Sequence, residues 1–400
     1  MIDISKKSWL KYFLFGSLYF TEGLAYMIAS LILPIYLVEK GISVSLVTIV
    51  SAFFLMPMTI KFIWGGIVDY FIKYGRRKFI ILGGFFLFIS LGILFVINPS
   101  ELLPLFTVLL FVSGVGVGFL DVSADAWAIE ISTYEERGKI NGAMFAGQSA
   151  GMVVGSSVLS SIAQFYGYRY VFLITAFIVL LIIIFPLLVN DIKRVEKRQK
   201  IGVLLFDEFK KKTTQLVSVF SLLPALNIGL LGVVIPLYLN LYLHVDIAQI
   251  GVIISIWSGT KIIGSIVGGG ICDKWGRKKM LFVSLTFGLL FTALLIFANS
   301  WQIVAFLYGI IGVFHGAQYC VLSALLMDIT NPKVGATQYS ILTSIANLGM
   351  TVGESSSGIL VSILGFTRTF LYGAWFLGPG ILILHFIRLK KNELQGRDNG

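Results

Sequence analysis

The sequence predicts an all-α membrane protein with twelve transmembrane helices in two pseudo-symmetric six-helix bundles. Three observations lead to this prediction: the apolar composition, the number of long apolar stretches, and a basic loop that occurs twice. Hydrophobic residues make up 57% of the 400 residues and charged residues only 13%, whereas soluble domains average roughly 45–50% and about 25%. A single soluble core could not bury so much apolar surface, so lipid must cover most of it.

A helix needs roughly 20 apolar residues to cross a bilayer, and about twelve stretches of the chain meet this requirement. The first stretch contains Glu22 and no small-residue cleavage site, so we expect a spanning helix there and not a cleaved signal peptide. The expected spans lie near residues 11–38, 43–70, 79–98, 102–130, 138–164, 168–189, 214–243, 247–272, 280–298, 302–329, 335–363 and 369–388.

The distribution of positive charge predicts the orientation. With the N-terminus inside, 26 of the 31 lysines and arginines fall on the inner side; the outer side has only Lys40, Arg169 and Arg368, and Lys61 and Lys261 lie within spans. By the positive-inside rule, we expect a multi-pass protein of the cytoplasmic (inner) cell membrane with both termini in the cytoplasm. The net charge of +11 then reflects the orientation of the protein in the membrane and does not indicate nucleic-acid binding.

A repeat divides the chain into halves. The run G-M-V-V-G at 151–155 aligns with G-M-T-V-G at 349–353, an offset of 198 that also places Glu130 on Asp328. We therefore predict an N-terminal bundle over 1–189, a basic cytoplasmic linker over 190–213, and a C-terminal bundle with a short tail over 214–400. The linker is either an amphipathic segment on the inner leaflet or a solvated hinge.

The repeated basic loop is the most specific motif. Its second copy, residues 269–279, reads G-x-x-x-D-K-x-G-R-K-K; its first copy, residues 65–78, has three extra residues before Gly75 and Tyr70 after Asp69. The pattern resembles the signature of the major facilitator superfamily, G-x-x-x-D-[RK]-x-G-R-[RK]-[RK]. Residues 57–69, Phe20–Leu24 and Asp121–Trp127 give a narrower resemblance to its muropeptide-permease and acetyl-CoA-transporter branch.

This resemblance implies a secondary transporter in which the two loops form a cytoplasmic latch. An aspartate at a helix end can face the positive N-terminus of another helix and can pair with the following arginine. We expect two charged clusters, Asp69–Arg76–Glu130 and Asp273–Arg277–Asp328; alternatively, these charges only anchor helix ends. The candidate latch residues are Gly65, Asp69, Gly75, Arg76, Arg77, Glu130, Gly269, Asp273, Gly276, Arg277 and Asp328.

Ionisable residues within spans are candidates for function, since each costs roughly 2.5–3.5 kcal/mol to insert. Burial favours the neutral form of a carboxyl group, which suits a proton carrier, and a midplane lysine suits an anionic substrate. The proton-coupling candidates are Glu22, Asp121, Asp125, Glu354 and Lys61. The substrate-binding candidates are Lys261, His315, Gln318, Tyr319, Tyr19, Gln148 and Asn227. Alternatively, Lys61 only pairs with Asp121 or Asp125, and His315 is a packing residue.

These features favour proton-coupled uptake of an anionic or zwitterionic organic solute by alternating access. An exporter of amphipathic or cationic compounds that exchanges them for protons is the alternative, and a membrane solute sensor is a second. The chain has no Walker loop, no HExxH and only three histidines, so we expect no enzyme, cofactor or metal site. The expected partners are a small-molecule substrate, protons and the lipid bilayer, with the protein acting as a monomer.

Overall fold

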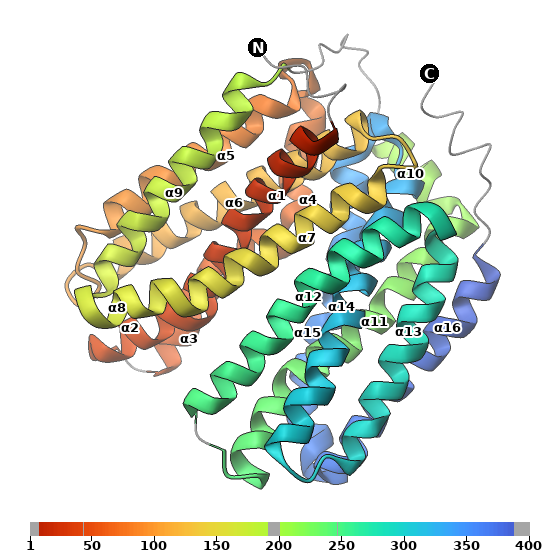
Figure 1. The fold of residues 1–400 in the computed structure, drawn as a ribbon. Helices are drawn as coiled ribbons and strands as arrows, with labels where there is room; N and C mark the ends of the chain where they lie inside the picture. Colours follow the sequence, from red (N-terminus) through yellow and green to blue (C-terminus); the bar gives the residue numbers. More distant parts are fainter. Residues whose placement is uncertain (1–7, 43, 191–200, 246, 388–400) are drawn as a thin grey trace. The chain divides into compact units, whose positions relative to one another are not determined.

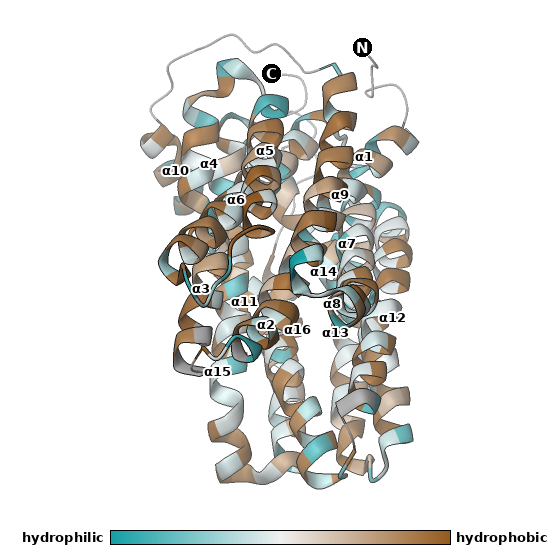
Figure 2. Ribbon diagram, turned by 90° about the vertical axis from the view of Figure 1, so that its left-hand side faces the viewer, coloured by the Kyte–Doolittle hydropathy of each residue, from teal (hydrophilic) through white to brown (hydrophobic). Residues whose placement is uncertain are grey.

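The computed structural model describes residues 8–42, 44–190, 201–245 and 247–387. Every regular element in these ranges is helical, which confirms the all-α prediction. Nine helical segments are long and apolar enough to cross a membrane, or ten when the bent pair Ile49–Thr59 and Lys61–Tyr70 counts as one span. Figure 2 shows long hydrophobic stretches along these helices, among them α3 (Val44–Thr59), α5 (Arg76–Leu94) and α6 (Leu103–Ile131).

Two features explain why fewer segments than twelve meet this test. The segment Pro332–Phe386 contains two helices, because Gly365 has a φ of 73° that interrupts the helix. The segment Arg137–Tyr166 is helical but carries arginine, lysine, asparagine, glutamine and several serines, which lower its hydropathy. With these features taken into account, the described helices agree with the twelve predicted spans.

The chain forms two compact units. The first unit contains residues 1–131, 147–201 and 332–340, and the second contains 132–146, 202–331 and 341–400. Each unit therefore includes a short segment that belongs to the other half of the sequence. Of the predicted linker, residues 191–200 lie outside the described residues, and Ile201–Lys210 forms helix α10.

The first unit contains most of the first half of the chain and a short segment of the second half (Figure 1). Pro57 and the non-helical Ile60 bend the second predicted span by 40°, as expected for a proline inside a helix. The elements of the first unit are α1 (Ser8–Met27), η1 (Ile28–Ile32), α2 (Leu33–Glu39), α3 (Val44–Thr59), α4 (Lys61–Tyr70), η2 (Ile72–Tyr74), α5 (Arg76–Leu94), α6 (Leu103–Ile131), the second part of α7 (Arg137–Val154), η3 (Gly155–Leu159), α8 (Ser160–Tyr166), α9 (Tyr168–Leu188), η6 (Pro332–Val334) and the beginning of α15.

The second unit contains the first part of α7 and most of the second half of the chain (Figure 1). Its core includes Leu230, Tyr238, Ile311 and Phe370, all buried. Its elements are α10 (Ile201–Lys210), α11 (Lys212–Leu237), η4 (Tyr238–Tyr242), α12 (Ile247–Trp275), α13 (Arg277–Leu294), η5 (Leu295–Phe297), α14 (Trp301–Ile329), the greater part of α15 (Gly335–Trp375) and α16 (Leu377–Phe386).

Close packing of α12 on α14 depends on glycine. A Cβ atom built on Gly264 would collide with the carbonyl oxygen of Val313, whereas one on Gly270, in the same helix, would meet nothing within 4 Å. We expect Gly264→Ala to lower the melting temperature, since overpacking costs about 1–3 kcal/mol. Gly270→Ala gains the same helix propensity without a clash, so it should melt at the wild-type temperature or above. Equal melting of the two purified variants would contradict this account of the packing.

Candidate functional site

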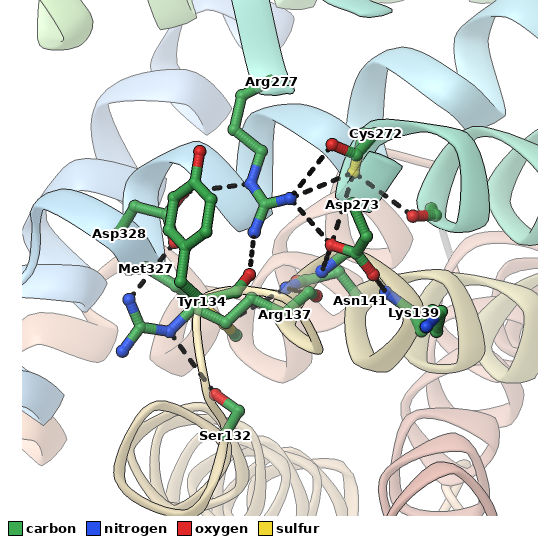
Figure 3. Close-up of polar contacts among 12 residues, drawn as sticks. Ser132, Tyr134, Arg137, Lys139, Asn141, Cys272, Asp273, Arg277, Met327 and Asp328 are labelled. Atoms are coloured by element: carbon green, nitrogen blue, oxygen red, sulfur yellow. Dashed lines mark hydrogen bonds and ion pairs between the residues drawn. The ribbon is translucent and has the colours of Figure 1, made fainter. Parts of the chain in front are cut away.

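The second basic loop forms a buried charged network in the second unit (Figure 3). Arg277, at the start of α13, lies 2.7 Å from Asp273 at the end of α12 and 3.0 Å from Asp328 at the end of α14. The arginine is 1% exposed, so the two carboxylates neutralise a guanidinium charge that water cannot solvate. We call Asp273, Arg277 and Asp328 the second network.

Asp273 also binds the beginning of α7. The backbone N–H groups of Gly138 and Lys139 each donate to its carboxylate at 2.9 Å. The first N–H groups of a helix have no partner within the helix, and the helix dipole favours negative charge at that end. A Cβ on Gly138 would collide with Cys272 and Asp273, so only glycine permits this approach.

Two further residues contact the second network, Arg137 at the start of α7 and Tyr134 just before it. Arg137 donates to Asp328 at 3.2 Å, so this carboxylate receives two guanidinium groups. The backbone carbonyl of Tyr134 accepts from Arg277, and the Tyr134 ring lies 4.4 Å from the guanidinium carbon. Burial raises the pKa of Tyr134 above its usual value, so the ring stays neutral at physiological pH.

The first basic loop forms a corresponding network in the first unit. Arg76, fully buried at the start of α5, lies 2.8 Å from Asp69 and 3.0 Å from Glu130. Asp69 in turn accepts from the backbone N–H and the hydroxyl of Thr337, both at 2.7 Å, and from the N–H of Ala336. It therefore caps α15 as Asp273 caps α7. We call Asp69, Arg76 and Glu130 the first network.

The glycines of the two loops have specific roles. Gly75 and Gly276 precede α5 and α13 with φ angles of 82° and 90°, which glycine adopts without strain. Gly65 and Gly269 let the backbones of Ala336 and Gly138 come close. Among the latch candidates Arg77 differs, because its guanidinium donates to the carbonyl of Val189 at the end of α9, 2.6 Å away.

The buried carboxylates of the first unit form a second kind of site. Lys61 pairs with Asp121 at 2.9 Å, and the hydroxyl of Tyr19 donates to Asp125. Glu22 lies near these charges, with Gln148 beside it. One oxygen of Glu22 and one of Asp125 are buried with no hydrogen-bond partner among the described residues. Tyr19 and Gln148, expected at a substrate site, thus lie with the proton-coupling candidates.

Lys261 of α12 occupies a different environment in the second unit. Its ammonium group lies 4.5 Å from the ring centre of Trp257 and 5.1 Å from that of Tyr319, and the ring of Phe145 packs on Tyr319 at 5.6 Å. The lysine is 8% exposed. Over the described part of the chain it has no ion pair with a carboxylate, and the proton-coupling candidate Glu354 is not within ion-pair distance of it.

His315 belongs to a polar chain beside Lys261. The indole N–H of Trp257, which can only donate, reaches Nδ1 of His315 at 3.3 Å. Nε2 therefore carries the proton and donates to the side-chain oxygen of Asn227 at 3.0 Å, while the Asn227 amide donates to Gly373. Both ring nitrogens are occupied in the neutral form, so His315 holds Trp257 in position and is not set up for protonation.

Gln318 lies apart from this group. Its amide donates to the carbonyl of Ser284 in α13 at 2.9 Å, whereas the next residue, Tyr319, lies at Lys261. Successive residues on a helix point about 100° apart, so the two candidates face different neighbours. Four residues of these sites were not predicted from the sequence: Trp257, Arg137, Tyr134 and Thr337. A signal existed for Trp257, which precedes Lys261 by one turn of the same helix.

The fold and these sites define a multi-pass membrane transporter. The family model described as Major Facilitator Superfamily matches residues 15–226 and 217–399, and the chain belongs to this superfamily. The resemblance inferred from the basic loops is thereby confirmed.

Individual relatives match the chain over almost its whole length. A Rickettsia conorii protein named AmpG 4 is 24% identical over 397 residues, 93% of this chain and 95% of that protein. The multi-drug resistance efflux pump PmrA of Streptococcus pneumoniae is 24% identical over 388 residues, 92% and 93% of the two chains. The human organic anion transporter MFSD10 shares the fold, with a TM-score of 0.76 at 13% identity over 94% of this chain and 99% of that one.

Proposed function

We propose that this transporter carries out proton-coupled uptake of an anionic or zwitterionic organic solute across the cytoplasmic membrane, with both termini in the cytoplasm. The observation that carries the proposal is Lys261, a buried ammonium group with aromatic neighbours and no carboxylate partner within the described residues. A buried charge without a counter-ion is costly. A carboxylate or phosphate of the substrate would supply the missing negative charge, and the rings of Trp257 and Tyr319 would contact its organic part.

Glu22 and Asp125 are the proposed proton carriers. Each has a buried carboxylate oxygen without a partner among the residues described, so a proton can be gained or lost there without breaking a hydrogen bond. Asp121 is less suited to this role, because it is the counter-ion of Lys61. Lys61 would keep the site close to neutral while one of the other carboxylates changes its charge.

The two networks are proposed to act as a latch between the functional halves, residues 1–189 and 214–400. Each network joins segments from both halves of the sequence: Asp273 and Asp328 bind the beginning of α7, and Asp69 binds the beginning of α15. Parting these contacts would release the beginning of α7 from the second half of the chain and the beginning of α15 from the first half. Such a step is what alternating access requires.

Transport in proteoliposomes tests the coupling. A solute found to stabilise the purified protein should accumulate against its gradient when an inward proton gradient is imposed. Glu22→Gln and Asp125→Asn should reduce this accumulation about tenfold or more, a loss of ~1.4 kcal/mol of driving free energy, yet retain exchange of labelled for unlabelled solute. Glu101→Gln removes an exposed carboxylate and serves as the control. Wild-type accumulation by both carboxyl variants would overturn the proposed carriers.

An exporter that exchanges amphipathic cations for protons is the second candidate. It is favoured by the group of three acidic residues in the first unit, Glu22, Asp121 and Asp125, which could bind a cation. The similarity to PmrA, whose name describes a multi-drug efflux pump, points the same way. In the proteoliposome experiment this function would appear as proton-driven movement of cations in the opposite direction.

A further inference from the structure

A groove in the second unit lies at the basic-loop end of α12, α13 and α16. It has a volume of about 450 Å³. The positively charged or titratable residues along it are Lys278, Lys279 and His385, and its apolar wall includes Trp275, Phe282 and Leu384. None of these residues belongs to the charged networks or to the surroundings of Lys261.

The groove carries positive charge that no carboxylate among the described residues neutralises. Lys278 and Lys279 follow Arg277 in the first turn of α13, where the helix dipole already favours anions. Arg277 is compensated by Asp273 and Asp328. Neither lysine has an ion pair with a carboxylate in the described ranges. The positive charge at this end of α13 therefore favours the binding of an external anion.

At the corresponding place in the first unit a hydrogen bond joins the two helices. There Arg77, the second residue of α5, donates to the carbonyl of Val189 and so ties the start of α5 to the end of α9. Lys278 is the second residue of α13 and holds the equivalent position in the repeat. Within the part of the chain that the structure describes, it makes no such bond to the end of α16, and the groove is open at this point.

We propose that the groove binds the headgroup of an acidic phospholipid from the leaflet at this end of the bundle. The two lysines would face the headgroup phosphate, and its acyl chain would lie along Trp275 and Phe282, which are 58% and 52% exposed. A free phosphate would leave that apolar wall unused. Tryptophan at the level of the headgroups is typical of membrane proteins, and basic pockets between spanning helices bind acidic headgroups.

The bound lipid would also support the second network. Lys278 and Lys279 adjoin Arg277, so an anion held at the first turn of α13 fixes the backbone from which Arg277 reaches Asp273 and Asp328. Acidic lipid would thereby favour the state in which this network is intact. This inference does not depend on the transported solute, so it can fail or succeed independently of the proposed function.

Binding of phosphatidylglycerol to the detergent-purified full-length protein tests the proposal, with phosphatidylcholine as the neutral lipid. Native mass spectrometry and the lipid-dependent rise in melting temperature are the readouts. We expect phosphatidylglycerol to bind more tightly, and Lys278→Gln/Lys279→Gln to weaken it about thirtyfold, or roughly fivefold for each lysine. Lys73→Gln/Lys78→Gln removes two charges from the corresponding loop of the first unit and should leave binding unchanged.

Several results would overturn the proposal. Equal binding of the two lipids would remove the anionic specificity. An equal loss in the Lys73/Lys78 control would show that only total charge matters. Stabilisation by inorganic phosphate to the same extent as by phosphatidylglycerol would indicate a small-anion site. Specific binding that emerges only after removal of residues 388–400 would show that the chain itself fills the groove.

Discussion

Replacing Arg277 by alanine is expected to raise the maleimide labelling rates of Cys272 and Cys320 at least tenfold. These are the only two cysteines of the chain, and both are 0% exposed. The thiol of Cys320 donates to the carbonyl of Gly138 at 3.2 Å, and Cys272 precedes Asp273. Parting α7 from α12 and α14 would therefore uncover both thiols together.

The size of this effect follows from the burial of the second network. Without Arg277, Asp273 and Asp328 would share the low-dielectric site with only Arg137 as counter-ion. Removing one partner of a buried ion pair costs about 3–5 kcal/mol, and the variant can avoid part of this cost by opening the network to water. A tenfold change in labelling requires only ~1.4 kcal/mol of that free energy, so the prediction is conservative.

Two further variants distinguish opening from general unfolding. Lys274→Ala removes an exposed charge from the same loop and should label at the wild-type rate. Arg137→Ala removes one of the two cations on Asp328 and should give an intermediate rate with little loss in melting temperature. If Arg277→Ala is folded at the labelling temperature and its thiols stay unreactive, the second network does not hold the beginning of α7 against α12 and α14.

The sequence indicated the members of the networks better than their full set of partners. The repeat offset aligned Glu130 with Asp328, and their negative charge suggested that each pairs with the arginine of its own loop. The structure confirms both ion pairs, Arg76 with Glu130 and Arg277 with Asp328. The sequence could not show which helix starts donate to Asp69 and Asp273. The donors are backbone N–H groups, which every residue except proline has, so no residue type identifies them. Arg137 was overlooked because the repeat gives no signal for it. At the offset of 198 the residue that corresponds to Arg137 is Gly335, which has no charge.

The buried sites show a second limit of sequence reasoning. Hydropathy located the spans to within a few residues, as in the predicted 302–329 against Trp301–Ile329. It does not specify which face of a helix meets which neighbour. Gln318 and Tyr319 therefore looked equivalent, although one bonds to α13 and the other lies against Lys261. For Lys61 the sequence left open whether it pairs with Asp121 or Asp125; the structure shows the pair with Asp121, whereas Lys261 has no carboxylate partner among the described residues.

This difference between the two lysines leads to the prediction with the largest effect on function. We expect Lys261→Ala to weaken binding of the anionic substrate at least thirtyfold, because truncating one partner of a buried charge pair costs about 2–5 kcal/mol. A panel of organic carboxylates, organic phosphates and cationic amphiphiles, screened by thermal shift, measures the effect. A ligand that binds only the folded state raises the melting temperature by mass action.

The unliganded variant provides the sharper test. Lys261 makes cation–π contacts worth roughly 0.5–2 kcal/mol, but its ammonium group is buried without a counter-ion in the described structure. Desolvating an unpaired charge costs more than that, so Lys261→Ala should melt at the wild-type temperature or above it without ligand. Lys61→Ala, which leaves Asp121 without its counter-ion, should melt well below the wild-type temperature. Lys261→Arg should retain part of the anion binding.

The combination of the two measurements decides the role of Lys261. Stability that is kept while anion-dependent stabilisation is lost means that the lysine is retained for binding and not for folding. If Lys261→Ala instead melts as low as Lys61→Ala, the lysine is a structural residue. If, in addition, cationic amphiphiles stabilise the wild type and the variant equally, the acidic residues of the first unit become the binding site, and export of cations replaces uptake of anions as the function that the structure supports.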